Sequence, residues 1–157
     1  MNECLVENIQ NKTAYNDKQL SFQGDRRQLE FLLHSIRAGD IALWNRWVAS
    51  NRFRRINLCG ADFSHLDLSG VDLSNADLSY TSMDFCLLKG ACLKKAVLKN
   101  ATLRGADLSD ADLADTDFQY ANLYETRVAA AALLKASSLR KAFIKNIRFV
   151  DGAVMVA

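Results

Sequence analysis

The sequence predicts an all-β solenoid that winds as a square coil, with four five-residue sides in each turn and a short α-helical cap at its N-terminal end. Three observations support this prediction. A large apolar residue recurs at every fifth position, a small residue recurs two places before it, and the 157-residue chain contains no proline. A helix would repeat its apolar residues about every 3.6 positions and a half-buried strand every 2. A period of five fits neither of these elements.

The repeat is clearest in GADFSHLDLSGVDLSNADLS, residues 60–79, where an aspartate precedes each large apolar residue. The large column runs for sixteen units between Ile56 and Lys135: Leu58, Phe63, Leu68, Leu73, Leu78, Met83, Leu88, Leu93, Leu98, Leu103, Leu108, Leu113, Phe118, Leu123, Val128 and Leu133. If each unit forms one side of a square, its large and small residues point to the axis, and residues twenty apart stack as in other solenoids. The absence of proline fits such a coil, because the backbone N–H groups are needed between turns.

After Leu133 the register shifts by one residue. The large column resumes at Leu139, Ile144 and Phe149, and the small column resumes at Ser137, Ala142 and Ile147. The shift falls in RVAAAALLKASS, whose alanines also suit a short helix. We expect the coil to continue with a bulge near Ala136, and a terminal helix is the alternative.

The units ADLSD, ADLAD, ANLYE and ADLSY match the consensus of the pentapeptide-repeat family, which is Ala, then Asp or Asn, then Leu, then two variable residues. The chain therefore resembles that family. The resemblance implies a right-handed quadrilateral β-helix of pentapeptide repeats. It implies little about function, because many family members have no known activity and a fold alone does not establish one.

Residues 26–50 are predicted to cover the first turn, whose bare end would expose apolar side chains and unpaired backbone groups. The segment RRQLEFLLHSIRA predicts one helix, which Gly39 can end, and Asp40 can cap the next helix. The apolar faces of the two helices contain Leu29, Leu32, Leu33 and Ile36, then Ile41, Trp44, Trp47 and Val48. Family members often carry a WNxW segment before the repeats, here residues 44–47. We interpret the two tryptophans as packed in the cap, and a ligand platform is the alternative.

Four segments are predicted along the chain: a flexible N-terminal segment over residues 1–25, a helical cap over 26–55, the repeat coil over 56–151 with a register slip near 131–137, and a tail over 152–157. Neither a signal peptide nor a membrane-spanning apolar run is visible. The four cysteines follow no paired spacing, which favours free thiols. We therefore expect a cytoplasmic protein that does not bind membranes, and the family resemblance implies a bacterial one.

No catalytic, metal-binding or cofactor-binding residues are predicted. His34 lies on the first cap helix, and His65 occupies an outward coil position beside no cysteine. Cys86 belongs to the small inward column, while Cys59 and Cys92 face different sides of the square, which argues against a shared metal. The repeat itself explains the aspartates. We therefore expect a protein without enzyme activity, cofactor or small-molecule substrate.

The outward position after each large residue changes character over one turn. It carries Lys89, Lys94, Lys99 and Arg104 on four successive units, where the neighbouring turns carry mostly serine. Over the same units the aspartate column is interrupted. We interpret these four residues as a candidate protein-binding surface. The alternative is a solvated surface whose charged bands attract each other weakly.

We expect a non-enzymatic scaffold that acts through contacts with an unidentified protein partner, as a monomer or an end-to-end dimer. The resemblance supplies two alternatives, because some family members mimic DNA and bind or protect gyrase and related topoisomerases, and others are secreted bacterial effectors. DNA mimicry calls for a strongly acidic rod, whereas the coil from Ile56 to Asp151 carries twelve acidic and eleven basic residues. The net charge of +2 does not indicate nucleic-acid binding either.

Overall fold

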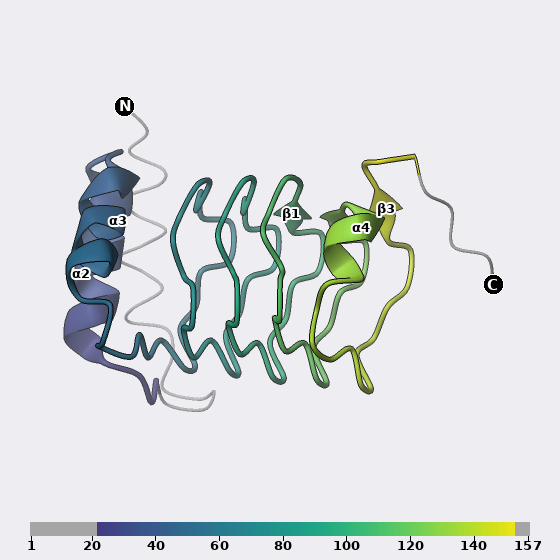
Figure 1. Ribbon diagram of the computed structural model, residues 1–157, viewed down its shortest axis with the longest axis horizontal. Helices are drawn as coiled ribbons and strands as arrows, with labels where there is room; N and C mark the ends of the chain where they lie inside the picture. The colour runs from purple at the N-terminus through teal and green to yellow at the C-terminus, as the bar shows by residue number, and fades with distance from the viewer. Residues whose placement is uncertain (1–21, 153–157) are drawn as a thin grey trace.

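The computed structural model describes residues 22–152, which form two helices followed by a coil of stacked turns (Figure 1). The helices are α2 (Arg26–Arg37) and α3 (Ile41–Ser50), and they stand side by side at one end of the coil. The regular strands are β1 (Asp107–Leu108), β2 (Arg127–Val128) and β3 (Arg148–Phe149), and a third helix, α4 (Ala130–Leu133), lies near the other end.

Parallel backbone pairing between residues twenty apart holds the turns together. On one side of the coil Asn57 pairs with Asp77, Asp77 with Val97, and Val97 with Asp117, and the other sides show the same spacing. Within this ladder the amide of Leu58 donates to the carbonyl of Asp77 at 2.9 Å. A period of twenty residues equals four five-residue sides, which is the square coil that the sequence predicts.

Both inward columns are buried. Every large residue from Leu58 to Val128 has an exposed fraction of at most 1%. Leu66, which the sequence analysis did not assign, belongs to the small column and is 4% exposed. Three threonines in that column are also buried, and their hydroxyls are satisfied because Thr81, Thr116 and Thr126 donate to backbone carbonyls at 2.7–2.8 Å.

The corners of the square depend on left-handed backbone. From Gly60 to Glu125 every fifth residue has a φ between 57° and 76°, and at each corner an amide donates back to the carbonyl three residues earlier, as Ala61 does to Leu58 at 3.1 Å. This is the third position of a type II turn, which favours glycine and asparagine. Tyr80 and Phe85 occupy it nevertheless, although the conformation costs an L-residue about 1–2 kcal/mol.

The register slip is taken up by α4. Earlier bridges join residues twenty apart, whereas Asp117 pairs with Ser138 and Arg127 with Arg148, which are twenty-one apart. The single helical turn of α4 accommodates the extra residue and keeps Leu133 only 8% exposed. The coil thus continues past the slip, with a helical turn in place of the bulge expected near Ala136 and not as the terminal helix that was the alternative.

The last turn is less buried than predicted. Leu139, Ile144 and Phe149 pack against the core but are only partly buried. Ser137, which the sequence analysis placed inside, is exposed, and its hydroxyl donates to the carbonyl of Thr116 at 3.1 Å. The reason is geometric, because no further turn within the described residues covers this one.

The two N-terminal helices cover the first turn, as the sequence predicts. Leu32 of α2 and Trp44 of α3 are fully buried in the core. Gln28 of α2 also replaces a missing turn of backbone, because its Nε2 donates to the carbonyl of Arg55 at 3.1 Å and its Oε1 accepts from the amide of Asn57 at 2.7 Å. The cap thus satisfies backbone groups as well as covering apolar side chains.

Trp44 and Asn45 of α3 do the same on another side of the coil. Trp44 Nε1 donates to the carbonyl of Asp72 at 2.8 Å, and Asn45 Oδ1 accepts from the amide of Asp72 at 2.9 Å. Asn45 Nδ2 donates to the carbonyl of Gly70 at 2.9 Å. Leaving a buried backbone group unpaired costs about 1–3 kcal/mol, so these two side chains anchor α3 to the coil.

One helix cap differs from the prediction, and another was not predicted. Asp25 caps α2 by accepting from the amides of Arg27 and Gln28. Asp40 stands at the N-cap position of α3, as predicted, but its side chain makes no capping hydrogen bond. The chain ends the first helix at Arg37, and Gly39 follows with a φ of 65°, which agrees with its predicted role.

The predicted flexible segment over residues 1–25 falls largely outside the described residues, as does most of the predicted tail over 152–157. The part that is described is held in place. The amide of Gln23 donates to the carbonyl of Cys59 at 3.1 Å, and that of Asp25 donates to the carbonyl of Asn57 at 2.7 Å. Residues 23–25 therefore pair with the backbone of the first turn.

Replacing Leu98 by Asp should prevent folding, because it places a charge without a partner in the centre of the core. The matched control is Val97→Asp, at the neighbouring outward position between Asp77 and Asp117 of the ladder, which should change the free energy of unfolding by less than about 1 kcal/mol. Circular dichroism and thermal melts measure both. Equal melting of the two variants would contradict the inward and outward assignment.

Replacing Asn45 by Ala should lower the free energy of unfolding by about 1–3 kcal/mol, because it leaves the amide of Asp72 and the carbonyl of Gly70 unpaired. Asn45→Asp should recover part of this loss, since a carboxylate still accepts but no longer donates. Urea unfolding measures the difference. Arg46→Ala on the same helix, which loses only an exposed ion pair with Asp40 at 3.8 Å, should have little effect.

Candidate protein-binding surface

The aspartates of the repeat complete the turns of the backbone. Asp67 accepts from the amide of Ser69 at 2.9 Å, and the same bond to the residue two places on is made by Asp62, Asp72, Asp77, Asp107, Asp112, Asp117 and Asn122. In each case the side-chain oxygen accepts a hydrogen bond from the backbone two residues later, which forms an Asx turn. These carboxylates therefore have a structural role, which the sequence analysis attributed only to the repeat consensus.

Over one turn this pattern stops, and we call that turn the central belt. Its members before each large residue are Leu87, Cys92, Val97 and Thr102, and its members after each large residue are Lys89, Lys94, Lys99 and Arg104. The structure places the four predicted basic residues on four successive sides of the square, so it does not bring them together at one point. Lys89, Lys94 and Arg104 are exposed, and Lys99 is partly buried.

Two of the four basic residues are engaged within the protein. Arg104 Nε lies 2.8 Å from Asp84 Oδ2, and Lys99 Nζ lies 3.4 Å from Asp117 Oδ2. Among residues 22–152, neither Lys89 nor Lys94 takes part in an ion pair. The positive charge that is available to a partner is therefore concentrated on two adjacent sides of the belt.

Two apolar side chains that the sequence analysis missed are exposed here, one at the corner that precedes the belt and one on the belt itself. Phe85 is 51% exposed and Leu87 is 46% exposed, directly before Lys89 in the chain. The Phe85 ring is held across its corner, because it stacks on His65 with a centroid distance of 5.3 Å and a Cβ at Gly105 would lie 2.6 Å from it. The sequence signal was present, since Leu87 replaces an aspartate of the repeat.

The cysteines show no sign of reactivity. Burial raises the pKa of the Cys59 and Cys92 thiols, and the nearby carboxylate of Asp77 acts in the same direction on Cys59. Both therefore remain protonated at neutral pH, and Cys86 is fully buried, as predicted. Among residues 22–152, no group of three or more His, Cys, Asp and Glu residues could hold a metal ion. Cys4 lies outside the described residues.

Asp107, on the turn after the belt, has a perturbed pKa. Burial disfavours its charged form, but hydrogen bonds from the hydroxyl and amide of Ser109 and the charges of Arg127 and Lys89 outweigh burial and lower the pKa. Arg127 Nη1 lies 3.7 Å from Asp107 Oδ2. Lys89 is thus near enough to the aspartate to influence it, although the two residues form no direct ion pair.

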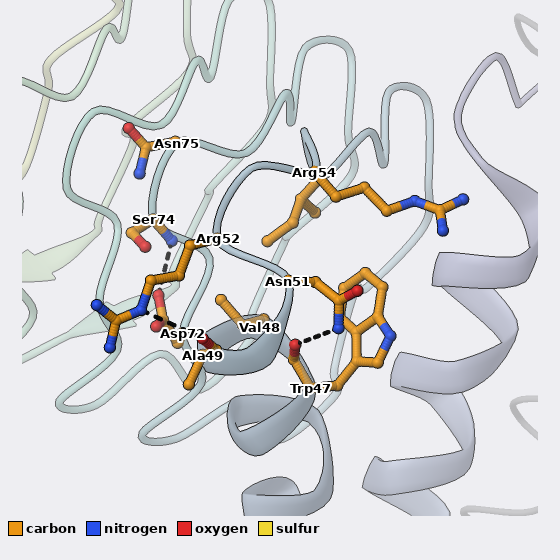
Figure 2. A pocket seen from close by; sticks show the side chains of 10 residues that line it. Trp47, Val48, Ala49, Asn51, Arg52, Arg54, Asp72, Ser74 and Asn75 are labelled. Carbon is orange, nitrogen blue, oxygen red and sulfur yellow. Dashed lines mark hydrogen bonds between the residues drawn. The ribbon is translucent and has the colours of Figure 1, made fainter.

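A cavity of about 360 Å³ lies between the end of α3 and the first turn of the coil (Figure 2). Its walls are formed by Trp47, Val48, Ala49, Asn51, Arg52, Arg54, Ile56, Asp72, Ser74 and Asn75. The two tryptophans of the WNxW segment therefore differ. Trp44 is buried in the cap, whereas Trp47, whose ring centroid lies 5.1 Å from that of Trp44, forms part of a cavity wall.

Within the part of the chain that the structure describes, no helix has the length and apolar character needed to cross a membrane.

Comparison with known proteins identifies the repeats. A family model described as pentapeptide repeats matches residues 52–90 and 91–127, with eight copies. No curated protein sequence matches the chain.

Solved structures of pentapeptide repeat proteins are also similar to the chain. One from the thylakoid lumen of Arabidopsis thaliana is 32% identical, with 58% of this chain and 59% of that chain covered and a TM-score of 0.40. Rfr23 from the cyanobacterium Cyanothece 51142 is 27% identical, with 60% and 56% covered and a TM-score of 0.41. A third, from Nostoc PCC 7120, is 25% identical, with 67% and 90% covered and a TM-score of 0.46. The match spans less than two thirds of the first two proteins.

Replacing Asp107 by Asn should lower the melting temperature at pH 7. Because the folded-state pKa is lowered, Asp107 stabilises the protein above its unfolded pKa of about 3.9, and this contribution is lost as the pH falls through the folded pKa. The difference from wild type should therefore shrink as the pH drops below about 4. Thermal melts across pH measure it, with Asp110→Asn at an exposed corner as the control. A difference that is independent of pH would contradict the role of the charge.

Proposed function

Because this chain belongs to the pentapeptide-repeat family, we propose that it is a non-enzymatic scaffold that binds a protein partner through the central belt of its coil. The family fold, a right-handed quadrilateral β-helix, presents regular outer faces on a packed core. The partner that fits the belt is acidic, with an apolar contact of its own. Phe85, Leu87, Lys89 and Lys94 form the contact surface in this proposal.

The observation that carries this proposal is that, over a single turn, apolar and basic side chains replace the aspartates and serines of the outer surface. On the other turns the outer residues are mostly aspartate and serine, and the aspartates are engaged with their own backbone amides. An exposed leucine of the belt and the exposed aromatic ring of Phe85 beside it lie near two lysines that form no ion pair with any residue in the range 22–152. Interfaces combine such an apolar centre with charges that orient the partner.

The distribution of charge gives less support to DNA mimicry and gyrase binding. The coil from residue 57 to residue 128 carries eleven acidic and six basic residues, so it has an acidic surplus. However, no acidic residue occurs between Asp84 and Asp107, where five basic residues lie. The belt therefore divides the acidic surface, whereas a DNA mimic needs continuous negative charge along its length. Delivery as a secreted effector remains a separate alternative, which surface chemistry does not address.

Changing Lys89 and Lys94 together to serine tests the belt. Folding should be intact, because exposed substitutions usually shift stability by less than about 0.5 kcal/mol each. Affinity for an acidic partner should fall, and the remaining binding should depend less on salt, because fewer screened charges contribute. The double variant is sharper than one that also changes Lys99 and Arg104, since those substitutions would leave Asp117 and Asp84 without their partners.

The control is Lys135→Ser combined with Lys145→Ser, which removes the same charge from exposed residues of the last turns. Partners captured from the native organism by wild type are titrated against all three proteins at low and high salt. Equal affinity for the two double variants would show that the belt is not the docking surface. A DNA supercoiling assay with gyrase separates the alternative, because mimicry predicts that the loss of Lys89 and Lys94 strengthens inhibition.

A further inference from the structure

The cavity beside the cap occupies the place of a missing side of the coil. Counting five residues back from Leu58 in the large column reaches Phe53, which would lie over Leu73 twenty residues later. In the structure Phe53 is instead fully exposed. The first bridge on the coil pairs Asn57 with Asp77, so residues 51–55 add no strand to the first turn. The cavity lies where that strand would be.

The backbone at this place has an open hydrogen-bonding position. On one side of the first turn the carbonyl of Cys59 accepts from the amide of Gln23 at 3.1 Å. One turn further on, the carbonyl of Ser79 accepts from the amide of Gly60 at 2.9 Å. Ser74, at the equivalent position on the cavity wall, accepts no hydrogen bond at its carbonyl from any residue in the described range. An added strand could therefore donate to it.

The lining of the cavity combines apolar side chains with one guanidinium group that makes no ion pair among the described residues. Trp47, Val48 and Ile56 supply the apolar part. Arg52 is fixed by a bond from its Nε to the carbonyl of Ala49 at 3.2 Å, and it makes no ion pair within residues 22–152. Figure 2 shows its guanidinium group extending past Asp72 and Ser74.

The remaining charges are already engaged. Arg54 lies 3.4 Å from Asp25 Oδ2, and its side chain extends away from Arg52 (Figure 2). Asp72 accepts from the amide of Ser74 at 3.0 Å. Arg52 is therefore the lining cation without a carboxylate partner among the described residues, and an anionic group of a ligand could pair with it. The volume of about 360 Å³ falls in the range of about 300–1,000 Å³ that is usual for ligand sites.

We propose that this cavity binds an extended, acidic peptide segment of a partner protein. One large apolar side chain of the segment lies on Trp47, Val48 and Ile56. A backbone N–H of the segment donates to the carbonyl of Ser74, and a neighbouring carboxylate pairs with Arg52. This is recognition by addition of a strand to an exposed sheet edge, in which backbone bonds give affinity and side-chain pockets give specificity. The site shares no residue with the central belt and goes beyond the function proposed above.

The experiment titrates the full chain with the capped peptide acetyl-Glu-Glu-Phe-Glu-Glu-amide, followed by calorimetry and by tryptophan fluorescence. Trp44 and Trp47 are the two tryptophans of the chain, and Trp47 lines the cavity, so binding should change the emission. The wild type should bind saturably. A peptide with alanine in place of phenylalanine, and one with lysine in place of each glutamate, should both lose binding.

Two protein variants locate the site. Asn75→Asp adds a negative charge to the cavity wall and should weaken binding about tenfold or more, because like charges at an interface are strongly unfavourable. Asn100→Asp is the matched control, because Asn100 is also a corner asparagine, with a φ of 57° against 59° for Asn75, and does not line the cavity. Both should fold, since Asp110 and Asp115 occupy corners with φ values of 60° and 59°.

Three outcomes would overturn the proposal. The first is no saturable binding by wild type at about 1 mM peptide, which is the weak limit for a specific contact. The second is equal affinity for the Asn75→Asp and Asn100→Asp variants. The third is binding that appears only in a Phe53→Ala variant, which would show that the cavity belongs to Phe53 of the same chain.

Discussion

The hydrogen bonding between turns is the constraint on which the rest of the structure depends. Each five-residue side bonds to the turn before and to the turn after: Asp77 bonds to Ile56 and Leu58 of the turn before, and its neighbours Ala76 and Leu78 bond to Val97 of the turn after. This pairing fixes the period at twenty residues, and the period in turn stacks leucine on leucine along the axis. It also requires a left-handed residue at every corner, even where that residue is Tyr80 or Phe85. A short side can accept this strain because two neighbouring turns hold it in place.

The geometry of the turns also divides the surface residues into those whose side chains hydrogen-bond to the local backbone and those whose side chains do not. An outward aspartate completes its own turn, so the acidic column is part of the structure. On the central belt that support is absent on four successive sides, where Leu87, Cys92, Val97 and Thr102 replace the aspartates. The belt therefore lacks these side-chain to backbone hydrogen bonds and instead has exposed apolar and basic side chains. Loss of a structural pattern at a surface, with a different chemistry in its place, is the main reason to look for a partner there.

The ends of the coil pose a different problem, because a terminal turn lacks one neighbour. At the N-terminal end the solution is made from side chains, since Gln28, Trp44 and Asn45 take the place of backbone donors and acceptors. The carbonyl of Ser74, on the cavity wall, receives no such replacement from the described residues. The incomplete edge and the basic lining therefore have one origin, because residues 51–55 leave the coil instead of joining it. Because residues 51–55 do not pair with the first turn, an added peptide strand could bind at that edge.

The sequence by itself determined the coil, its core and the position of the belt, because a column of leucines at every fifth position is a local pattern that one kind of backbone can bury. It also indicated both cap helices, whose apolar faces repeat at helical spacing. Contacts between residues twenty or more apart decided the rest. Lys99 and Arg104 look equivalent to Lys89 and Lys94 in the sequence, yet only the first two meet a carboxylate of an adjacent turn. Phe53 continues the apolar column in the sequence, but residues 51–55 form no bridge to the coil, so the tertiary structure leaves Phe53 in solvent beside the cavity.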